Sequence, residues 1–413
     1  DSFATMADCL TNMRSLQGTM IFTSTWQVAG KEPVRVFGQQ QFVEMPFYNQ
    51  PVFDLLTEFE FLLHTMPAGK LQLQELEGLL LKQAELMRVH PNDNERTLRS
   101  RLWEALSLYA FNRTVIARLT ESLHGTEEAE EGVKLQAWAE RLASVPAPHE
   151  QSLFENMPSG RLLNWLNVRN PDSRQLKSIA ARLAKHNGGP QFGIMLLDLD
   201  ADMVKLQATF DSLVSGHCKA FKVVVFTTGD LPAITTSRDT VHFIKVTATN
   251  YVERINQSLA QSTADWLVLA EAGDQFTASG LLRASLELLG AEGIRAVAMD
   301  EIQRQENGSL ADVFRPGVNL DFLQTVPSLM ARHWLIQRDV LVNAGGYSTE
   351  YLSALEFDLL LRLIEEGGMN GLAHLAEPLL ICNASAADEN PHERQALTRH
   401  LKARGYRAQV SSE

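Results

Sequence analysis

Acidic side chains follow several short hydrophobic runs in the second half of the chain. They are Asp198, Asp200, Asp230, Glu271, Asp274, Asp300 and Glu301. If the runs are parallel strands, their carboxyl ends meet at one edge of a sheet, which is where α/β proteins bind ligands. The carboxylates would then form an acidic rim, which repels a diphosphate unless a divalent cation, backbone amides or a basic side chain lies between. Oxygen ligands of this kind suit Mg²⁺ or Mn²⁺, although each residue taken alone also fits an ordinary exposed loop.

The elements that must position these acids alternate between strands and helices. Strand-like runs are expected at 192–197, 221–227, 242–246, 266–270 and 296–299, and helices at 201–214, 251–262, 277–289 and 356–366. Such alternation predicts an α/β fold with a mostly parallel sheet.

The first part of the chain has a different pattern. Leucines recur at three- and four-residue steps between 51 and 186, which predicts a mainly α-helical domain. Segments 89–93 and 168–172 each place Pro and Asp before an amphipathic helix, as at the junctions of tetratricopeptide-type repeats, but a generic helical bundle is the plainer interpretation. We therefore divide the chain into a short β-rich segment (1–50), a helical domain (51–186), an α/β domain (190–385) and a C-terminal helical tail (386–413).

Composition excludes several classes of protein. The chain has 413 residues and a net charge of −13, which argues against a nucleic-acid groove because such a groove needs concentrated positive charge. Cys9, Cys218 and Cys382 lie far apart without metal-ligand spacing, so we expect incidental thiols in a reducing compartment. No apolar run approaches the ~18–20 residues that a membrane span needs. A soluble cytoplasmic protein is therefore expected.

Ordered segments of the second half resemble family 2 glycosyltransferases. Segment 255–274 is similar to their asparagine-bearing helix and the strand that ends in a D-x-D motif. Segment 314–323 is similar to F-K-P-x-W-x-P-D-L-L, and segment 336–347 to R-x-x-L-x-x-x-G-G-F. Segment 355–363 is similar to (E/Q)-D-x-D-L-x-x-R-L. The resemblance covers a little under half of the chain, and the order and spacing of the segments argue against chance.

The resemblance implies an inverting transferase of the GT-A type, with a Rossmann-like α/β domain, that moves a sugar from a nucleotide-diphosphate donor to a hydroxyl acceptor. It assigns the general base, which takes the acceptor's proton, to Glu356, with Asp358 at the accompanying acidic position. The donor-binding candidates are Asp198, Asp200, Asp230, Asp274 and Arg315. The metal candidates are Asp274 and Glu271, with Mn²⁺ or Mg²⁺ as the cofactor. The acceptor-binding candidates are Arg332, Trp334, Gly345 and Gly346. Arg315 and Arg332 are also the basic residues that we expect to face the diphosphate.

Some of these candidates also have plainer interpretations. Trp334 could stack on a sugar, but core packing is the commoner role of a tryptophan. Gly345 and Gly346 allow a tight turn with positive φ, which a sugar-binding wall or any plain loop can need. Glu356 and Asp358 suit the start of a helix in any protein, because the helix dipole stabilises carboxylates there.

The sequence also departs from the family's motifs. Residues 197–200 read Leu-Asp-Leu-Asp where P-x-Y-N is usual, residues 271–274 read Glu-Ala-Gly-Asp in place of D-x-D, and the late histidine is replaced around Cys382 and Asn383. A catalytically decayed GT-A-like module that binds or scaffolds is therefore the alternative. A nucleotidyltransferase is disfavoured because residues 197–203 hold no glycine or basic residue to bind a triphosphate.

The resemblance also implies a biological setting. It points to bacterial surface-glycan or glycoprotein assembly on the cytoplasmic side, peripheral to the inner membrane. The expected partners are a nucleotide-diphosphate sugar and a glycan or protein acceptor. The helical region at 51–186 would then dock the acceptor, a partner protein or a second copy of the chain. If its repeat-like character is real, a polypeptide acceptor is favoured over a lipid-linked one.

Overall fold

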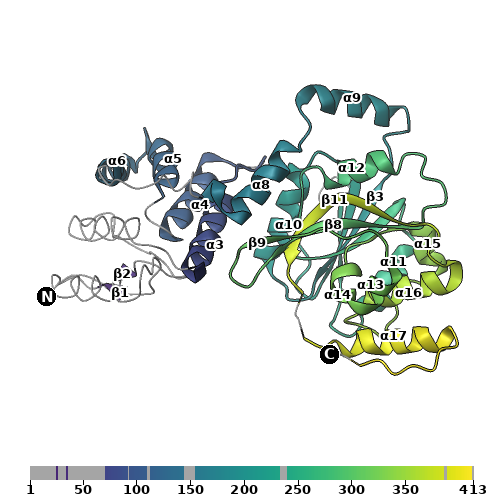
Figure 1. Cartoon of the computed structure of the whole chain (residues 1–413). Helices are drawn as coiled ribbons and strands as arrows, with labels where there is room; N and C mark the ends of the chain where they lie inside the picture. The colour runs from purple at the N-terminus through teal and green to yellow at the C-terminus, as the bar shows by residue number, and fades with distance from the viewer. Residues whose placement is uncertain are drawn as a thin grey trace. The chain divides into compact units, whose positions relative to one another are not determined.

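The computed structural model describes residues 25–26, 34–35, 70–91, 93–108, 112–143, 154–232, 240–385 and 388–411. The chain forms two compact units, which are described separately (Figure 1). The first comprises Asp1–Val168 and Arg304–Ala311, and the second Arg169–Gln303 and Asp312–Glu413. The domain boundaries expected from the sequence stay predictions. Most of the expected β-rich segment at 1–50, and the helical pattern at 51–69, lie outside the described residues.

The first unit is mainly helical in its described part. Its helices are α3 (Lys70–Leu86), α4 (Glu95–Leu108), α5 (Arg113–Leu123), α6 (Ala129–Ala143) and α8 (Pro158–Val168). Two short strands, β1 (Thr25–Trp26) and β2 (Val34–Arg35), pair antiparallel. Asn112 caps α5, because its side chain accepts the N–H groups of Thr114 and Val115, and its amide donates to Gln83 of α3 at 2.8 Å. The helical character predicted for this region is confirmed.

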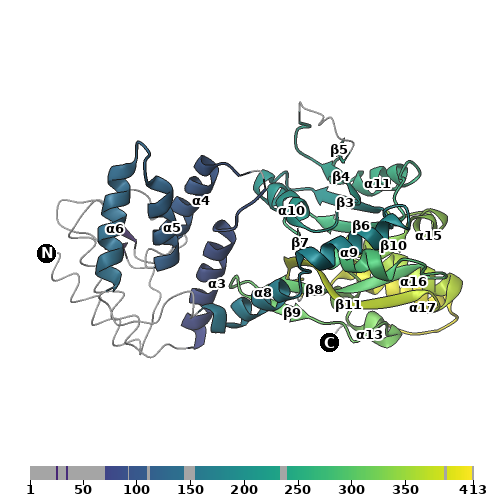
Figure 2. The ribbon, with the colours of Figure 1, turned by 90° about the horizontal axis from the view of Figure 1, so that it is seen from above.

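The second unit contains a mixed sheet whose strands are connected mainly through helices. Its strands are β3 (Phe192–Asp198), β4 (Phe221–Thr227), β5 (Val241–Lys245), β6 (Trp266–Glu271), β7 (Gln275–Phe276), β8 (Ala296–Arg304), β9 (Leu310–Val313), β10 (Leu335–Gln337) and β11 (Leu372–Asn383). They follow the order β5-β4-β3-β6-β10-β8-β11-β7, with β9 paired to β8 (Figure 2). The pairs β5–β4, β4–β3 and β3–β6 are parallel, whereas β10 lies antiparallel between β6 and β8.

Helices cover both faces of this sheet. They are α9 (Ser173–Ala184), α10 (Met203–Ser215), α11 (Tyr251–Leu259), α12 (Gly280–Glu287), α13 (Leu320–Thr325), α14 (Pro327–Met330), α15 (Arg338–Asn343), α16 (Leu355–Gly367) and α17 (Pro391–Ala403). Figure 1 shows α9 and α12 on one side of the sheet and α16 and α17 on the other. Strand β3 is buried on both faces, so its side chains alternate between two hydrophobic cores. Ile194 and Leu196 belong to one core and Met195 and Leu197 to the other.

This architecture confirms an α/β domain with helices on both faces of its sheet, following a mainly helical region. Each strand expected between 192 and 299 is present, and the parallel strands all present their carboxyl ends to one edge. The antiparallel strands β10 and β11 complete the sheet. Among the described residues, no helix is both long enough and apolar enough to cross a membrane.

Candidate functional site

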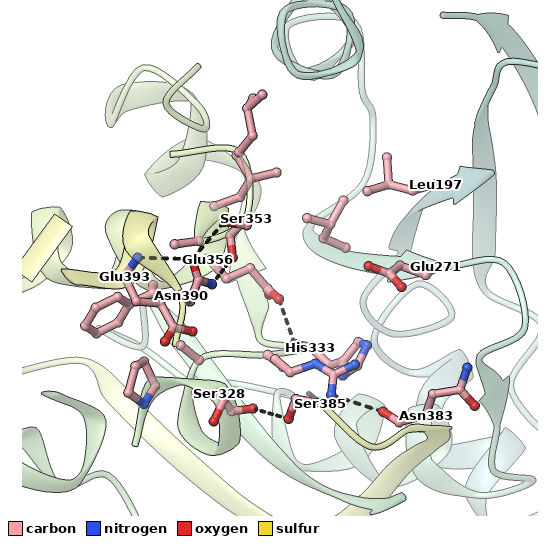
Figure 3. A pocket seen from close by; sticks show the side chains of 18 of the residues that line it. Leu197, Glu271, Ser328, His333, Ser353, Glu356, Asn383, Ser385, Asn390 and Glu393 are labelled. Atoms are coloured by element: carbon pink, nitrogen blue, oxygen red, sulfur yellow. Dashed lines mark hydrogen bonds between the residues drawn. The ribbon is translucent and has the colours of Figure 1, made fainter. Parts of the chain in front are cut away.

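A pocket of about 690 Å³ opens at the carboxyl ends of β3 and β6. Several elements distant in sequence line it. They include Leu197 from β3, Glu271 from the end of β6, Arg332 and His333 from the turn before β10, Glu356 from the start of α16, and Asn390 and Glu393 from the start of α17. In Figure 3, Glu271 and Glu356 lie on different sides of the pocket, with His333 between them. The pocket therefore lies where an open α/β sheet binds its ligands.

Glu356 is held at the pocket by two backbone N–H groups. Its Oε2 accepts the N–H of His333 at 2.9 Å, and its Oε1 accepts the N–H of Trp334 at 3.1 Å. The residue stands in the first turn of α16 and is half-buried. Burial raises the pKa of Glu356, and the charge of His333 and the two N–H groups oppose that rise only in part. A fixed carboxylate with a raised pKa is a suitable general base.

His333 links two further carboxylates through its ring. Its Nε2 lies 3.1 Å from Oδ2 of Asp274, and its Nδ1 lies 2.9 Å from Oε2 of Glu301. All three side chains are buried. Burial alone would lower the pKa of His333, but the charge of Asp274 and the hydrogen bonds to both carboxylates raise that pKa to about 10. The imidazole is therefore a cation at neutral pH.

The backbone of His333 is itself constrained. Its φ is 56°, in the left-handed region that few residues other than glycine adopt. This conformation lets the main chain donate to Glu356 while the ring reaches Asp274 and Glu301. Strained backbone of this kind clusters at functional sites, and here it joins the two sides of the candidate site.

Arg315 is the second buried cation of this cluster. Its guanidinium lies 3.4 Å from Glu301 and donates to the carbonyls of Met299, Leu329 and Arg332. Burial would raise the pKa of Glu301, but its hydrogen bond to His333 and the charges of His333 and Arg315 lower that pKa to about 2. Two carboxylates, Asp274 and Glu301, are thus balanced by two cations, His333 and Arg315.

The turn 271–274 closes on itself. The N–H of Glu271 donates to Oδ2 of Asp274 at 2.9 Å, and the N–H of Asp274 donates back to the carbonyl of Glu271 at 3.0 Å. Gly273 permits the turn with a φ of 104°, and its N–H donates to the Thr209 hydroxyl. The same Oδ2 of Asp274 therefore faces both the Glu271 N–H and the His333 ring, while the side chain of Glu271 stays exposed at the pocket.

This donor set does not fit a divalent cation at Asp274. The Oδ2 of Asp274 already accepts the N–H of Glu271 and faces the His333 ring, so a cation at this oxygen would have to displace both groups. Donor atoms of Glu301, His333 and Cys382 also lie within 4.8 Å of one another. Burial, with the charge of Glu301, raises the pKa of the Cys382 thiol, so a metal at these three atoms would have to displace both the thiol proton and a ring proton of His333.

The donor-binding candidates do not line the pocket. Asp198 is buried and accepts the Thr227 hydroxyl at 2.7 Å and the Asp202 N–H at 3.0 Å. Asp200 and Asp230 are exposed, and their nearest cations are Lys205 at 3.3 Å and Lys245 at 3.8 Å, respectively. Asp274 and Arg315 also lie outside the pocket lining. Their roles in donor binding stay predictions.

Asp358 faces away from the pocket although it lies two residues after Glu356. Its carboxylate lies 2.8 Å from Nε of Arg362 and 3.3 Å from Arg399 of α17. Asp358 is fully buried and does not line the pocket. The contact with Arg399 joins α16 to α17, and the catalytic role of Asp358 stays a prediction.

One of the four acceptor candidates lines the pocket and the other three do not. Arg332 lines the pocket and donates to the carbonyl of Asn383 at 3.2 Å. Trp334 lies in the core, the alternative kept from the sequence, and its indole N–H donates to Met330. Gly345 and Gly346 have φ values of 81° and 77° and do not line the pocket. Their roles in acceptor binding stay predictions.

Several pocket residues were missed in the sequence. His333 stands between two chosen residues, but nothing in its neighbours indicates that its ring joins two carboxylates. The start of α17 was expected only as a helical tail, yet Asn390 and Glu393 line the pocket. The Ser353 hydroxyl donates to Asn390 at 2.8 Å. The Asn390-Pro391 pair is a good helix start, and it was the available signal for this part of the pocket lining.

Comparisons with known proteins give likenesses of shape alone. No protein-family model and no curated protein matches the chain. Among solved structures, it is similar to TarS 1–349 of S. aureus (13% identity, TM-score 0.38, covering 52% of this chain and 71% of that one). It is also similar to the mannosyltransferase PcManGT of Pyrobaculum calidifontis in complex with GDP-Man and Mn²⁺ (14%, 0.38, 57% and 77%). A third is glucosyl-3-phosphoglycerate synthase of Mycobacterium tuberculosis (17%, 0.36, 57% and 86%). At these values the assignment of function depends on the residues of the pocket.

Proposed function

We propose that the second unit is an inverting glycosyltransferase that uses a nucleotide-diphosphate sugar and Glu356 as general base. The observation that carries the proposal is the Glu356 carboxylate, which two backbone N–H groups hold at a pocket on the carboxyl edge of the sheet. Its raised pKa favours proton acceptance. The family resemblance of segment 355–363 assigns the base to the same residue.

The reaction at this site balances without a covalent intermediate. Glu356 takes the proton of the acceptor hydroxyl while that oxygen forms a bond to the anomeric carbon of the sugar. The bond from the anomeric carbon to the diphosphate breaks on the opposite face, and the nucleoside diphosphate leaves with the electron pair. Arg332, a pocket residue, is the cation that we place against the leaving diphosphate.

The wider assignment belongs to the same proposal. From the resemblance we propose that the acceptor is a glycan or a protein. We also propose that the enzyme serves bacterial surface-glycan or glycoprotein assembly in the cytoplasm. The helical unit would dock the acceptor, a partner protein or a second copy of the chain.

A panel of nucleotide sugars tests the enzyme. We expect the wild-type chain to release nucleoside diphosphate from one of them, slowly by hydrolysis and faster with an acceptor hydroxyl. Glu356→Gln removes the base and should lower the rate by about 10²–10⁴-fold, with nucleotide binding retained. Glu366→Gln, an exposed position on the same helix, is the matched control and should keep the wild-type rate. Equal rates in wild type and Glu356→Gln would refute the role of Glu356.

A binding or scaffolding module is the second candidate. The carboxylates of Asp198 and Asp274, both expected to bind the donor, already form hydrogen bonds with other groups of the chain, and this favours a binding module. If the chain is such a module, the same panel of nucleotide sugars should show saturable binding to the wild-type chain and no turnover.

A further inference from the structure

Asp274 is the residue at which the resemblance places a divalent cation, and a histidine side chain stands there instead. Nε2 of His333 lies 3.1 Å from Oδ2 of Asp274, and both side chains are buried. His333 comes from the turn between α14 and β10, not from the segment around Cys382 where the family's late histidine is replaced.

The hydrogen-bond partners show what the ring provides. Each ring nitrogen of His333 faces an oxygen of a carboxylate, Asp274 on one side and Glu301 on the other. An ionised carboxylate only accepts hydrogen bonds. Both contacts are therefore satisfied together when the ring carries a proton on each nitrogen, which makes it a fixed cation between two anions.

The charges of the cluster leave no requirement for a metal. Asp274 and Glu301 supply two negative charges, and His333 and Arg315 supply two positive charges, with Arg315 3.4 Å from Glu301. Glu356 and Arg332 add one charge of each sign beside them, and Asp300 lies 2.7 Å from the His374 ring. A divalent cation bound here would have to displace a proton of the His333 ring or leave uncompensated positive charge in a buried group, and either is unfavourable. It would also compete with the Glu271 N–H for Oδ2 of Asp274.

We propose that His333 replaces the divalent cation in this chain, so that the site handles a nucleotide diphosphate without a metal. The inference deepens the proposed function, since it concerns the donor side of the same site. Its ring neutralises Asp274 and Glu301, and Arg332, the preceding residue, is left as the pocket cation for the diphosphate.

Metal titration tests this inference without any turnover. Mn²⁺ is added to the full chain and the free ion is followed by electron paramagnetic resonance, with Zn²⁺ followed by calorimetry. We expect no stoichiometric site for either ion in wild type, and EDTA should not change the binding of a nucleoside diphosphate. One Mn²⁺ or Zn²⁺ bound per wild-type chain, lost in Asp274→Asn, would overturn the proposal.

Removal of the imidazole provides the opposite test. His333→Ala leaves two carboxylates against one buried guanidinium, so it should gain one Mn²⁺ site, and His333→Ala with Asp274→Asn should lose it again. A folded His333→Ala that binds no Mn²⁺ contradicts the replacement. If His333→Ala does not fold, the wild-type and Asp274→Asn titrations decide. A chain that binds no metal but transfers no sugar refutes the proposed function and leaves this inference standing.

Discussion

The main-chain N–H of His333 donates to the Glu356 carboxylate at 2.9 Å, while the ring of the same histidine lies between two other acids. One residue thus fixes the proposed base on one side and neutralises the donor-side carboxylates on the other. The base belongs to α16 and the acids to the 271–274 turn and β8. Displacement of the 332–334 turn would therefore disturb both halves of the site together.

Loss of the His333 ring should destabilise the second unit strongly. Breaking a buried ion pair by removing one partner typically costs about 3–5 kcal/mol, because a buried charge is left uncompensated. We expect His333→Ala to lower the free energy of unfolding, measured with urea, by an amount of this order. His242→Ala, at an exposed position on β5, should change it by less than about 0.5 kcal/mol. Equal effects of the two substitutions would show that the ring is not part of a buried ion cluster.

The same cluster should make stability depend on pH in the alkaline range. The pKa of His333 is raised from 6.5 to about 10 in the folded chain, so its contribution is complete below pH 6.5 and is lost as the pH rises through about 10. The free energy of unfolding should therefore fall between these values. His333→Gln, which does not titrate, should show a flatter profile over the same range in urea unfolding followed by circular dichroism. A wild-type profile as flat as that of the variant contradicts the assignment.

Local pattern was sufficient to predict five strands of the second unit and to single out Glu356. Strand β3 is an unbroken apolar run, and Glu356 stands in a motif whose spacing survives in the sequence. The 271–274 turn was also identified, because its acids directly follow a buried strand. These features depend on residues close together in the chain, which is why the sequence reveals them.

The contacts of His333 could not be predicted in this way. Its ring partners lie 59 and 32 residues away, and its positive φ is set by the turn that precedes β10. The three-residue strand β10 is too short to give a period-2 pattern, yet it places that turn beside β6 and β8. Tertiary pairing, rather than composition, therefore converts Asp274 from an expected metal ligand into the partner of an internal cation.

The glycine pair after α15 offers a matched test of backbone packing. Both residues have positive φ, so alanine at either position should cost roughly 1–2 kcal/mol from the backbone alone. A Cβ at Gly346 would also lie 2.2 Å from Oδ1 of Asn256, whereas a Cβ at Gly345 meets nothing within 4 Å. Asn256 accepts the N–H of Tyr347 and donates to its carbonyl, each at 2.8 Å. Gly346→Ala should therefore destabilise more than Gly345→Ala in urea unfolding, and an equal loss would argue against this close contact.

Activity should respond to pH through Glu356. The base works only when it is ionised, and burial raises its pKa above the ordinary 4.5. The value of kcat/KM should therefore rise with pH along a limb whose midpoint lies above pH 4.5, and the enzyme should lose activity below that midpoint. The limb should be kept in Glu366→Gln, which changes an exposed carboxylate of the same helix.

Glu356→Asp keeps a carboxylate but shortens its arm, so it cannot reach both the His333 and the Trp334 N–H from the same backbone position. We expect it to retain the pH limb at a lower rate, whereas Glu356→Gln should lose the limb together with the activity. A wild-type limb that persists in Glu356→Gln would assign the titrating base to another residue.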